Sequence, residues 1–507
     1  MALLESAVVL QVFRDVTPMA ILATLLLTTF LTYVVYMRHF HPLSQCPGPF
    51  FASLSNTYKA YYVYKLTIHE KLLELHNTYG PIVRVGPNHL HTWKGDAIAL
   101  IYKGGRSMGK SEFYDAFTAF RPNLFGGRDE DIHALRRRQL SHGFAQVSVA
   151  KLEPLIDGQM AILISKLRHY ARTGQAFDLK HALNLYVLDI LGEVAFAKAF
   201  DVQNTEDNEK LHAINDHLLL AGVIGELPCQ NFTKFLSRLS PVPWMRRLMK
   251  SRNKLKEICA GCVRFKIENL EATKSRPDLL RSLVEATDPE SGKSVAGSHS
   301  TAGTLTLLFW HLIQNPSIMR KVQAEIENTL GPLKDRTSYP IAGIESTLKY
   351  TMACVRENFR INPVFTMPLW RRVGKSHVLE IDGHHIPEGT NICISNYVLH
   401  HNPSVFGPDH NTFVPEKWLD ESYNREKGRY LIPFSVGHRM CIGRNLAMTN
   451  ILKSVCTLAT LFEFEPVEKK KDVRVISPGI GEMKGGFEVR VRVREVKRGS
   501  YKNALST

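Results

Sequence analysis

The hydrophobic positions of this chain form one continuous run near its beginning and periodic patterns afterwards. Residues 18–37 (PMAILATLLLTTFLTYVVYM) carry no charged side chain, and an apolar helix of about 30 Å spans the hydrocarbon core of a bilayer. Arg38, His39 and His41 follow directly, and basic residues tend to stay on the cytoplasmic side. No small-residue cleavage site follows, so the pattern predicts a retained signal anchor over 18–37 after a short lumenal segment over 1–17.

The segment after this apolar run is rich in proline. Pro42, Pro47 and Pro49 fix their own φ angles and disfavour helix in the residue before each of them. The sequence therefore predicts that the anchor ends here and that 38–49 is a stiff hinge. No later polar break is long enough to act as a linker, which predicts one globular domain over 50–507.

Helical periodicity, with apolar residues three and four positions apart, dominates this domain. The stretches predicted as helices are 67–78, 132–146, 150–172, 178–199, 208–220, 249–272, 295–314, 316–330, 346–361 and 444–461. Alternating patterns are sparser, and the stretches predicted as strands are 82–86, 377–382, 391–396, 473–477 and 487–494. The chain is predicted to be mainly α with small β-sheets, preceded by a single N-terminal transmembrane helix.

Charge and cysteine content narrow the class of protein. A formal net charge of +16 and an isoelectric point near 9.4 suit an acidic partner or an anionic membrane surface, although a soluble, self-repelling surface explains them equally well. Nucleic acid is not expected, because the basic clusters are short, scattered and without aromatic interleaving. The eight cysteines have no framework spacing, which fits a reducing compartment. The CxxC at 259–262 is interpreted as part of a core helix face.

A solitary cysteine lies in the segment PFSVGHRMCIGRNLA, directly before the last predicted helix. The positive end of that helix favours the thiolate form of Cys441, and Gly437 and Gly443 permit close approach of a rigid body. Arg439 can pair with carboxylates, and Phe434 supplies an aromatic wall. These features suit an iron porphyrin, with sulfur on the metal and guanidinium on a propionate. A buried cysteine beside a turn is the structural alternative.

The segment FSVGHRMCIG resembles the haem-binding signature FxxGxRxCxG of the cytochrome P-450 monooxygenases at all five fixed positions. The similarity extends through nearly the whole chain after the anchor. It implies the cytochrome P-450 fold, haem b ligated through Cys441, and a haem-binding catalytic domain over 50–507. It also implies O2, a hydrophobic small-molecule substrate and an NADPH-cytochrome P-450 reductase, with cytochrome b5 as a second candidate donor. The implied location is the endoplasmic reticulum membrane, single-pass, with a cytosolic catalytic domain.

Two further segments resemble the network that positions the cysteine loop in this family. ENFR at 357–360 is similar to ExxR, and Glu357 and Arg360 share one helix face because they are three residues apart. FVPEKW at 413–418 resembles the PERF segment, but Lys417 stands where the family usually has arginine. Lysine cannot make the planar bidentate fork of arginine, which predicts a looser network.

Haem propionate partners are implied at three other positions. HALRRRQL at 133–140 resembles the helix that carries WxxxR in the family. His133 replaces the tryptophan and Arg137 aligns with the arginine. Arg371 is a third candidate, and the adjacent Arg372 stays open as its alternative. Without the other motifs, the segment 133–140 would be interpreted as a solvated basic helix.

The segment VAGSHSTAGTL at 295–305 resembles the oxygen-activation motif AGxDTT. His299 replaces the family's acid and Ser300 its threonine, with Thr301 following. A hydroxyl and a titratable imidazole can relay protons, so these three are the candidate catalytic residues. The preceding residues contain Pro289 and Gly292, which cannot continue a helix backward. Part of the substrate-facing helix is therefore expected to be absent before Val295, through either a gene-model error or an impaired pocket.

The resemblance implies a monooxygenase that inserts one oxygen atom from O2 into a hydrophobic small molecule. The segment VRENFRINPVFTMPLWRRVG is similar to enzymes of filamentous fungi that modify secondary metabolites, so a terpenoid, polyketide or alkaloid is expected. Family placement puts 113–120, 365–367 and 479–486 at the substrate pocket. Two alternatives stay open: a haem-binding but catalytically impaired homologue, and a haem isomerase or dehydratase that needs no dioxygen.

Overall fold

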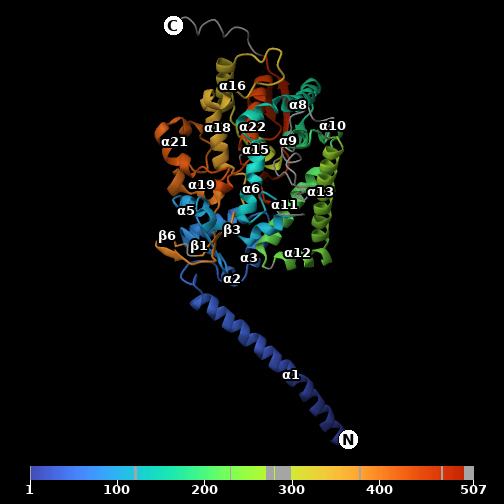
Figure 1. The fold of residues 1–507 in the computed structure, drawn as a ribbon, viewed down its shortest axis with the longest axis vertical. Helices are drawn as coiled ribbons and strands as arrows, with labels where there is room; N and C mark the ends of the chain where they lie inside the picture. The colour runs from blue at the N-terminus through green and yellow to red at the C-terminus, as the bar shows by residue number, and fades with distance from the viewer. Residues whose placement is uncertain are drawn as a thin grey trace.

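The computed structural model describes residues 2–118, 123–228, 230–269, 279, 298–375, 378–469 and 472–495, with only the backbone for residues 2–17. A mainly helical body carries small sheets, and one long helix projects from one end of it (Figure 1). The predicted fold class is thereby confirmed. The predicted absence of part of a helix before Val295 concerns residues outside the described part of the chain.

The helices and strands have the following bounds. The helices are α1 (Ala2–Val35), α2 (Phe50–Leu54), α3 (Thr57–Tyr64), α4 (Ile68–Tyr79), α5 (Ala97–Tyr102), α6 (Glu130–Ser141), α7 (Gln146–Ala150), α8 (Glu153–Thr173), α9 (Leu179–Phe196), α10 (Val202–Thr205), α11 (Glu209–Glu226), α12 (Gln230–Leu239), α13 (Pro243–Glu268), α15 (Ser298–Gln314), α16 (Pro316–Leu330), α17 (Ile344–Thr347), α18 (Lys349–Ile361), α19 (Asn396–His400), α20 (Pro403–Phe406), α21 (Glu421–Lys427) and α22 (Arg444–Leu461). The strands are β1 (Ile82–Gly86), β2 (His89–Thr92), β3 (Met108–Lys110), β4 (Phe177–Asp178), β5 (Arg371–Val373), β6 (Leu379–Ile381), β7 (His384–Ile386), β8 (Asn391–Ile394), β9 (Phe462–Pro466), β10 (Val475–Ile476), β11 (Glu482–Met483) and β12 (Glu488–Val493).

The N-terminal helix α1 is helical from Ala2 onward and continues as a π-helix to Phe40. Pro18–Phe40 is apolar enough to cross a membrane, with a mean hydropathy of 1.9. Most of it is exposed, but Met37 near its end is buried. The helix therefore ends inside the predicted hinge rather than at residue 37. The short lumenal segment and the domain boundaries stay predictions.

The hinge packs against the first strand of the body. Arg84 of β1 donates from Nη1 to the carbonyl of Met37 at 2.8 Å and from Nη2 to the carbonyl of Pro87 at 2.7 Å. The Arg84 amide donates to the carbonyl of Pro47 at 2.7 Å. A Cβ at Gly48 would lie 2.2 Å from the Arg84 carbonyl oxygen, so the close contact requires glycine.

The largest sheet has the strand order β1-β2-β8-β5-β3. β1 and β2 form an antiparallel hairpin, β2 pairs with β8 in parallel, and β5 links β8 to β3 with antiparallel ladders. This register places Lys110 of β3 directly opposite Arg371 of β5. The smaller sheets are β4-β12-β9, β10-β11 and β6-β7.

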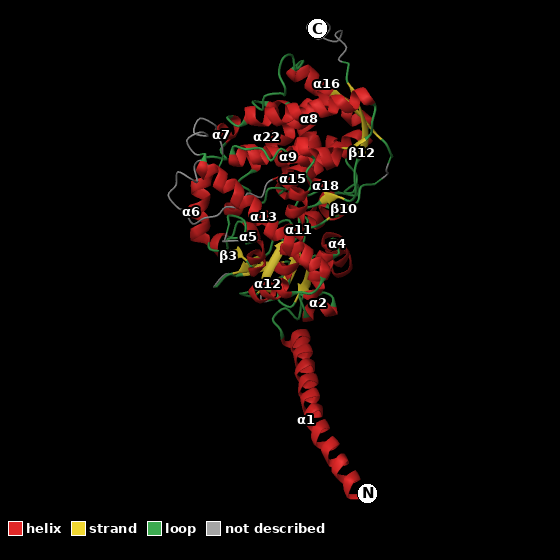
Figure 2. Ribbon diagram, turned by 90° about the vertical axis from the view of Figure 1, so that its right-hand side faces the viewer, coloured by secondary structure: helices red, strands yellow, loops and turns green. Residues whose placement is uncertain are grey.

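The central helix of the body is α15, which packs against α9, α16, α18 and α22 (Figure 2). Its side chains Leu305, Leu308 and Phe309 are fully buried, and the polar Thr304 and Thr306 are buried as well, so neighbouring elements enclose this helix. α22 is buried along most of its length and begins directly after the cysteine loop. The core therefore fixes both α15 and the start of α22.

Candidate functional site

The loop before α22 has a backbone that only glycine permits at one position. Gly437 has a φ of 78°, and a Cβ there would lie 2.3 Å from the carbonyl oxygen of Tyr102. The amide of Cys441 donates to the carbonyl of Phe434 at 2.8 Å, which closes the loop. These contacts hold the loop against α5 and place Cys441 three residues before Arg444, where α22 begins.

The Cys441 side chain remains accessible, although protein atoms surround it closely enough for desolvation to act on it. Burial raises the pKa of this thiol, while a hydrogen bond from the backbone N–H of Gly443 and the charge of Arg137 lower it. Arg137 of α6 donates to the carbonyl of Met440 at 2.7 Å. An accessible sulfur beside a cation and a helix start fits the ligand atom of a haem.

Arg439 connects the cysteine loop to the first turn of α6. Its guanidinium is buried and pairs with Glu130, with Nη2 2.8 Å from Oε1. It also donates to the carbonyl of Gly127 at 2.9 Å. His438 lies 2.9 Å from the other Glu130 oxygen, and the ring of the buried His133 lies 6.3 Å from that of His438. The structure thus brings together two predicted haem-binding positions, His133 on α6 and Arg439 on the cysteine loop.

The sheet adds two buried cations to this region. Lys110 and Arg371 are register partners with 8% and 2% of their surface exposed. The ammonium of Lys110 lies 4.2 Å from the ring centroid of Tyr114, and Arg371 donates to the Tyr114 hydroxyl at 3.2 Å. Burial, Arg371 and Arg439 lower the pKa of Lys110 well below its ordinary value, and Glu130 opposes them. The pair is therefore short of negative charge.

These groups also act on His133. Burial, Arg439 and Lys110 lower the pKa of His133 to about 3, against the effect of Glu130. Among the described residues, Glu130 is the carboxylate that acts on both Lys110 and His133. The basic residues around it outnumber it and include three buried ones. Because uncompensated buried charges are costly, the cluster fits a group with two carboxylates, such as the propionates of a haem.

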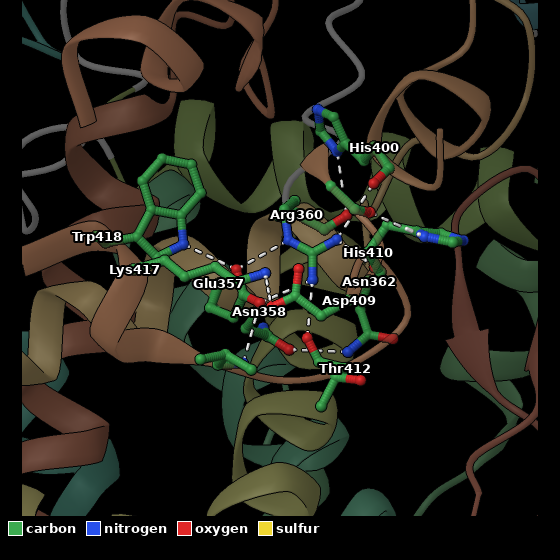
Figure 3. Close-up of polar contacts among 12 residues, drawn as sticks. Glu357, Asn358, Arg360, Asn362, His400, Asp409, His410, Thr412, Lys417 and Trp418 are labelled. Carbon is green, nitrogen blue, oxygen red and sulfur yellow. Dashed lines mark hydrogen bonds and ion pairs between the residues drawn. The ribbon is translucent and has the colours of Figure 1, made fainter. Parts of the chain in front are cut away.

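The predicted ExxR pair forms a closed, buried network behind the loop (Figure 3). Glu357 and Arg360 of α18 are fully buried, with Arg360 Nη2 2.7 Å and Nε 2.8 Å from the carboxylate oxygens. Arg360 also donates to the carbonyls of His400 at 3.2 Å and Thr412 at 3.0 Å. A buried ion pair is stable when its remaining donors are satisfied, as they are here.

Trp418 completes the network on the carboxylate side. Its Nε1 donates to Glu357 Oε2 at 2.8 Å, and the amide of Val414 donates to Oε1 at 3.1 Å. Lys417 instead pairs with Asp409 (Figure 3). The FVPEKW segment therefore binds Glu357 through the Trp418 indole and the Val414 amide. Lys417 makes its contact at the edge of the network, with Asp409.

Helix α18 also contacts the cysteine loop directly. The rings of Phe359 and Phe434 pack edge to face, with centroids 5.5 Å apart. The carbonyl of His400 accepts a hydrogen bond from Arg360. Nε2 of the same residue lies 3.1 Å from the carbonyl oxygen of Tyr430. The network thus positions the segment that leads into Phe434.

The predicted catalytic residues lie at the start of α15. His299 and Thr301 are buried and Ser300 is partly buried. His299 Nε2 lies 3.6 Å from Oε2 of Glu482 on β11, and Lys180 of α9 lies 3.6 Å from the same oxygen. Burial lowers the pKa of His299, Glu482 raises it and Lys180 lowers it.

The predicted pocket segments approach one another next to α15. A Cβ at Gly303 of α15 would lie 3.0 Å from the carbonyl oxygen of Gly481, and a Cβ at Gly481 would lie 2.9 Å from Thr366. A Cβ at Gly479 would lie 2.8 Å from Met367. Of the predicted segment 113–120, residues 119 and 120 lie outside the described part of the chain.

Sequence reasoning assigned no individual role to five residues of this region: Lys110, Tyr114, Glu130, Trp418 and Glu482. Tyr114, Trp418 and Glu482 nevertheless lie in segments that it placed at the site, namely 113–120, 413–418 and 479–486. The spacing of three residues between Glu130 and His133 was a usable signal for Glu130, although the predicted helix began only at residue 132. Lys110 and Glu482 have no local signal, because long-range strand pairing and hairpin packing bring them to the site.

Comparisons with known proteins agree with this geometry. The family model described as cytochrome P-450 matches residues 42–489. The chain is 30% identical over 494 residues to the cytochrome P-450 monooxygenase cicH of Emericella nidulans, covering 90% of this chain and 95% of the relative. It is 27% identical to a pisatin demethylase of Fusarium vanettenii, covering 90% and 89%. The chain therefore belongs to the cytochrome P-450 family and is a monooxygenase, which implies a haem-thiolate cofactor, O2 and a redox partner.

Proposed function

We propose that this enzyme inserts one oxygen atom from O2 into a hydrophobic secondary metabolite, with electrons from an NADPH-cytochrome P-450 reductase. The observation that carries the proposal is the accessible Cys441 beside a cluster of basic residues that is short of negative charge. Relatives that include a pisatin demethylase support a small-molecule substrate. A terpenoid, polyketide or alkaloid fits this class.

Cys441 ligates the iron of haem b in this proposal. Arg439, Arg137, Lys110 and Arg371 hold the propionates, because these basic side chains gather on that side of the loop. His133, whose pKa of about 3 leaves its ring neutral, contributes a ring N–H as a hydrogen-bond donor. When bound, the haem supplies dioxygen activation, and thiolate ligation favours cleavage of the O–O bond. The protein residues orient the substrate, exclude water and deliver protons.

Proton delivery falls to His299, Ser300 and Thr301, with Glu482 as the acid that the motif itself lacks. The separation of 3.6 Å between His299 Nε2 and Glu482 Oε2 needs a small shift to reach hydrogen-bond length. The Glu482 carboxylate stabilises the protonated ring of His299, which donates its proton, and a hydroxyl of Ser300 or Thr301 carries it on. Lys180 holds Glu482 in place through the 3.6 Å ion pair.

The membrane and the reductase complete the proposal. The apolar span Pro18–Phe40 anchors the chain in the endoplasmic reticulum membrane, with the body in the cytosol. The net charge of +16 suits an acidic reductase face, with cytochrome b5 as a second candidate donor. Electron transfer is then expected to slow at high ionic strength.

The test uses the full chain reconstituted with reductase in vesicles. In isotope-labelled dioxygen, a hydrophobic metabolite should gain one labelled oxygen atom in an NADPH-dependent reaction. NADPH consumption with hydrogen peroxide release and no product would select the impaired homologue. Product formation without NADPH would select an isomerase or dehydratase. A carbon monoxide complex without a strongly red-shifted Soret band, in pigmented protein, would overturn the assignment of Cys441.

A further inference from the structure

Asn358 lies between the two charged residues of the ExxR pair and connects helix α18 with helix α15. It is fully buried, and its Nδ2 donates to the carbonyl of Thr304 at 3.1 Å. A helix carbonyl accepts the amide four residues further on, and its second lone pair can accept a side-chain donor. The bond therefore joins the ExxR helix to the central helix at one defined position.

The orientation of the Asn358 amide is fixed by its neighbours. Nδ2 of Asn362 donates to Oδ1 of Asn358 at 3.1 Å and lies 2.7 Å from Nε2 of His311 (Figure 3). Burial and the charge of Arg360 lower the pKa of His311 to about 3, so the ring is neutral and its Nε2 can accept. Because Oδ1 of Asn358 is an acceptor here, its Nδ2 is the atom that faces Thr304.

Thr304 in turn binds the backbone of Ser300. Its hydroxyl donates to the carbonyl of Ser300 at 2.9 Å, and the side chain is buried. Such a bond to the carbonyl four residues earlier orients the threonine side chain and influences the local curvature of the helix. Two hydrogen bonds, made by one residue of α15, thus lead from Asn358 to Ser300.

The hairpin over 479–486 contacts the same part of α15. A Cβ at Gly303 would lie 3.0 Å from the carbonyl oxygen of Gly481. Glu482 of the same hairpin lies 3.6 Å through Oε2 from Nε2 of His299. A displacement of residues 299–304 would therefore change the separation between the His299 ring and the Glu482 carboxylate.

We propose that Asn358 and Thr304 are positioning residues for proton delivery. Asn358 fixes the carbonyl of Thr304, and the Thr304 hydroxyl holds the backbone of Ser300. The Ser300 hydroxyl and the His299 ring then keep their places beside Glu482. The inference rests on the proposed function, because it assigns no role in the reaction to Asn358 and Thr304 except through those residues.

Helix α15 offers a matched control for Thr304. The hydroxyl of Thr306 donates to the carbonyl of Ala302 at 2.8 Å, and Thr306 is also buried. Thr304→Val and Thr306→Val therefore remove the same type of bond from the same helix. Only the first change removes a bond to Ser300. Thr304→Ser keeps the hydroxyl and serves as the conservative variant.

The first measurement is the ratio of product formed to NADPH consumed by the haem-loaded full chain with reductase in vesicles. Thr304→Val and Asn358→Leu should lower this ratio about 2- to 10-fold, the factor that corresponds to one net hydrogen bond. Thr306→Val should match the unmodified enzyme, and Thr304→Ser should recover most of the ratio. An unchanged ratio in Thr304→Val, or an equal loss in Thr306→Val, would overturn the proposal.

The second measurement needs neither substrate nor reductase. The C–O stretching band of the carbon monoxide complex responds to the electric field of nearby polar groups, which is strong in a site of low dielectric constant. Thr304→Val and Asn358→Leu should shift or broaden this band, and Thr306→Val should leave it unchanged. Identical bands in Thr304→Val and Thr306→Val would overturn the proposal.

The two measurements separate this proposal from the proposed function. If the unmodified enzyme forms no product, the proposed function fails, and the infrared comparison still decides whether Asn358 and Thr304 position α15. Haem content and the Soret band of the carbon monoxide complex show whether each variant folds with its cysteine loop intact. If Asn358→Leu does not retain haem, Thr304→Val decides the outcome.

Discussion

Lys110 and Arg371 lie directly opposite each other on β3 and β5, and both side chains are buried. Like charges in this arrangement repel each other, and burial adds a desolvation cost. We therefore expect a bound anion to stabilise both charges. Removal of one of the two charges is therefore expected to have opposite effects on the haem-loaded and the haem-free protein.

Lys110→Met is expected to weaken haem retention and to stabilise the haem-free chain. Loss of one charge-assisted hydrogen bond costs about 1.5–3 kcal/mol, which corresponds to about 10- to 100-fold faster haem transfer to an acceptor protein. Without haem, the same change removes a repulsion and raises the thermal midpoint. Arg372→Met, at an exposed position paired with Glu112, should change neither quantity. Equal effects of the two variants would contradict the assignment.

Trp418→Phe is expected to destabilise the protein more than Lys417→Ala. The first change leaves Oε2 of the fully buried Glu357 without its indole donor, at a cost of about 2 kcal/mol. The second removes a pair whose partner Asp409 is 45% exposed, which is worth about 1 kcal/mol or less. Thermal midpoints of the holoenzymes measure the difference, and a larger effect of Lys417→Ala would show that lysine supports the network.

Glu482→Gln is expected to divert electrons from product to hydrogen peroxide. Burial holds the pKa of His299 below its ordinary value, and Glu482 raises it while Lys180 lowers it. Only the protonated ring of His299 can deliver a proton, so proton delivery is lost as pH rises through its pKa. Removal of the Glu482 charge lowers that pKa, so delivery is then lost at a lower pH. The ratio of product to NADPH consumed, measured against pH, shows the shift. Glu488→Gln, at an exposed position of β12, is the control and should match the unmodified enzyme.

Acid is expected to destabilise the fold through the pair His76 and His91. The amide of Ser395 donates to Nε2 of His91 at 3.1 Å, and Nδ1 of His91 lies 2.6 Å from Nε2 of His76. Nδ1 of His76 lies 2.6 Å from the carbonyl of Gly80. This chain of donors is complete only when both rings are neutral.

Burial lowers the pKa of His76 to about 4, while the unfolded chain protonates near pH 6.5. The stability of the neutral ring is fully present above pH 6.5 and is lost as pH falls toward 4, at up to about 1.4 kcal/mol per pH unit. His76→Gln should flatten the dependence of the thermal midpoint on pH, whereas His385→Gln, at an exposed position, should not. An unchanged slope in His76→Gln would refute this account.

Elements with strong local signals were predicted at or near their observed bounds. α16 begins at Pro316, where proline is compatible with the first turn, and α22 and β1 have the predicted bounds 444–461 and 82–86. The prediction over 132–146 was wrong as a single helix, because the chain breaks near Gly143 and resumes as α7. α12 was missed, since its apolar face lies on the surface instead of in the core.

The site was only partly predictable for a related reason. Cys441, Glu357 and Arg360 carry local spacing that indicates their roles, and the structure groups them around one loop. These roles stay predictions. Lys110 and Glu482 depend on strand register and hairpin packing, which join residues far apart in the chain. A short strand such as β3 has too few alternating positions to reveal its partner.

The contacts of Arg84 have a consequence for how the enzyme sits on its bilayer. Because this side chain binds Met37 at the end of the anchor and Pro87 in the turn between β1 and β2, the body cannot rotate freely relative to the anchor. The chain connection through the hinge and the hydrogen bonds of Arg84 together set the tilt of the body and its depth in the bilayer. A change in bilayer thickness would then alter the orientation of the whole enzyme relative to the membrane, and with it the route by which lipophilic molecules reach the body.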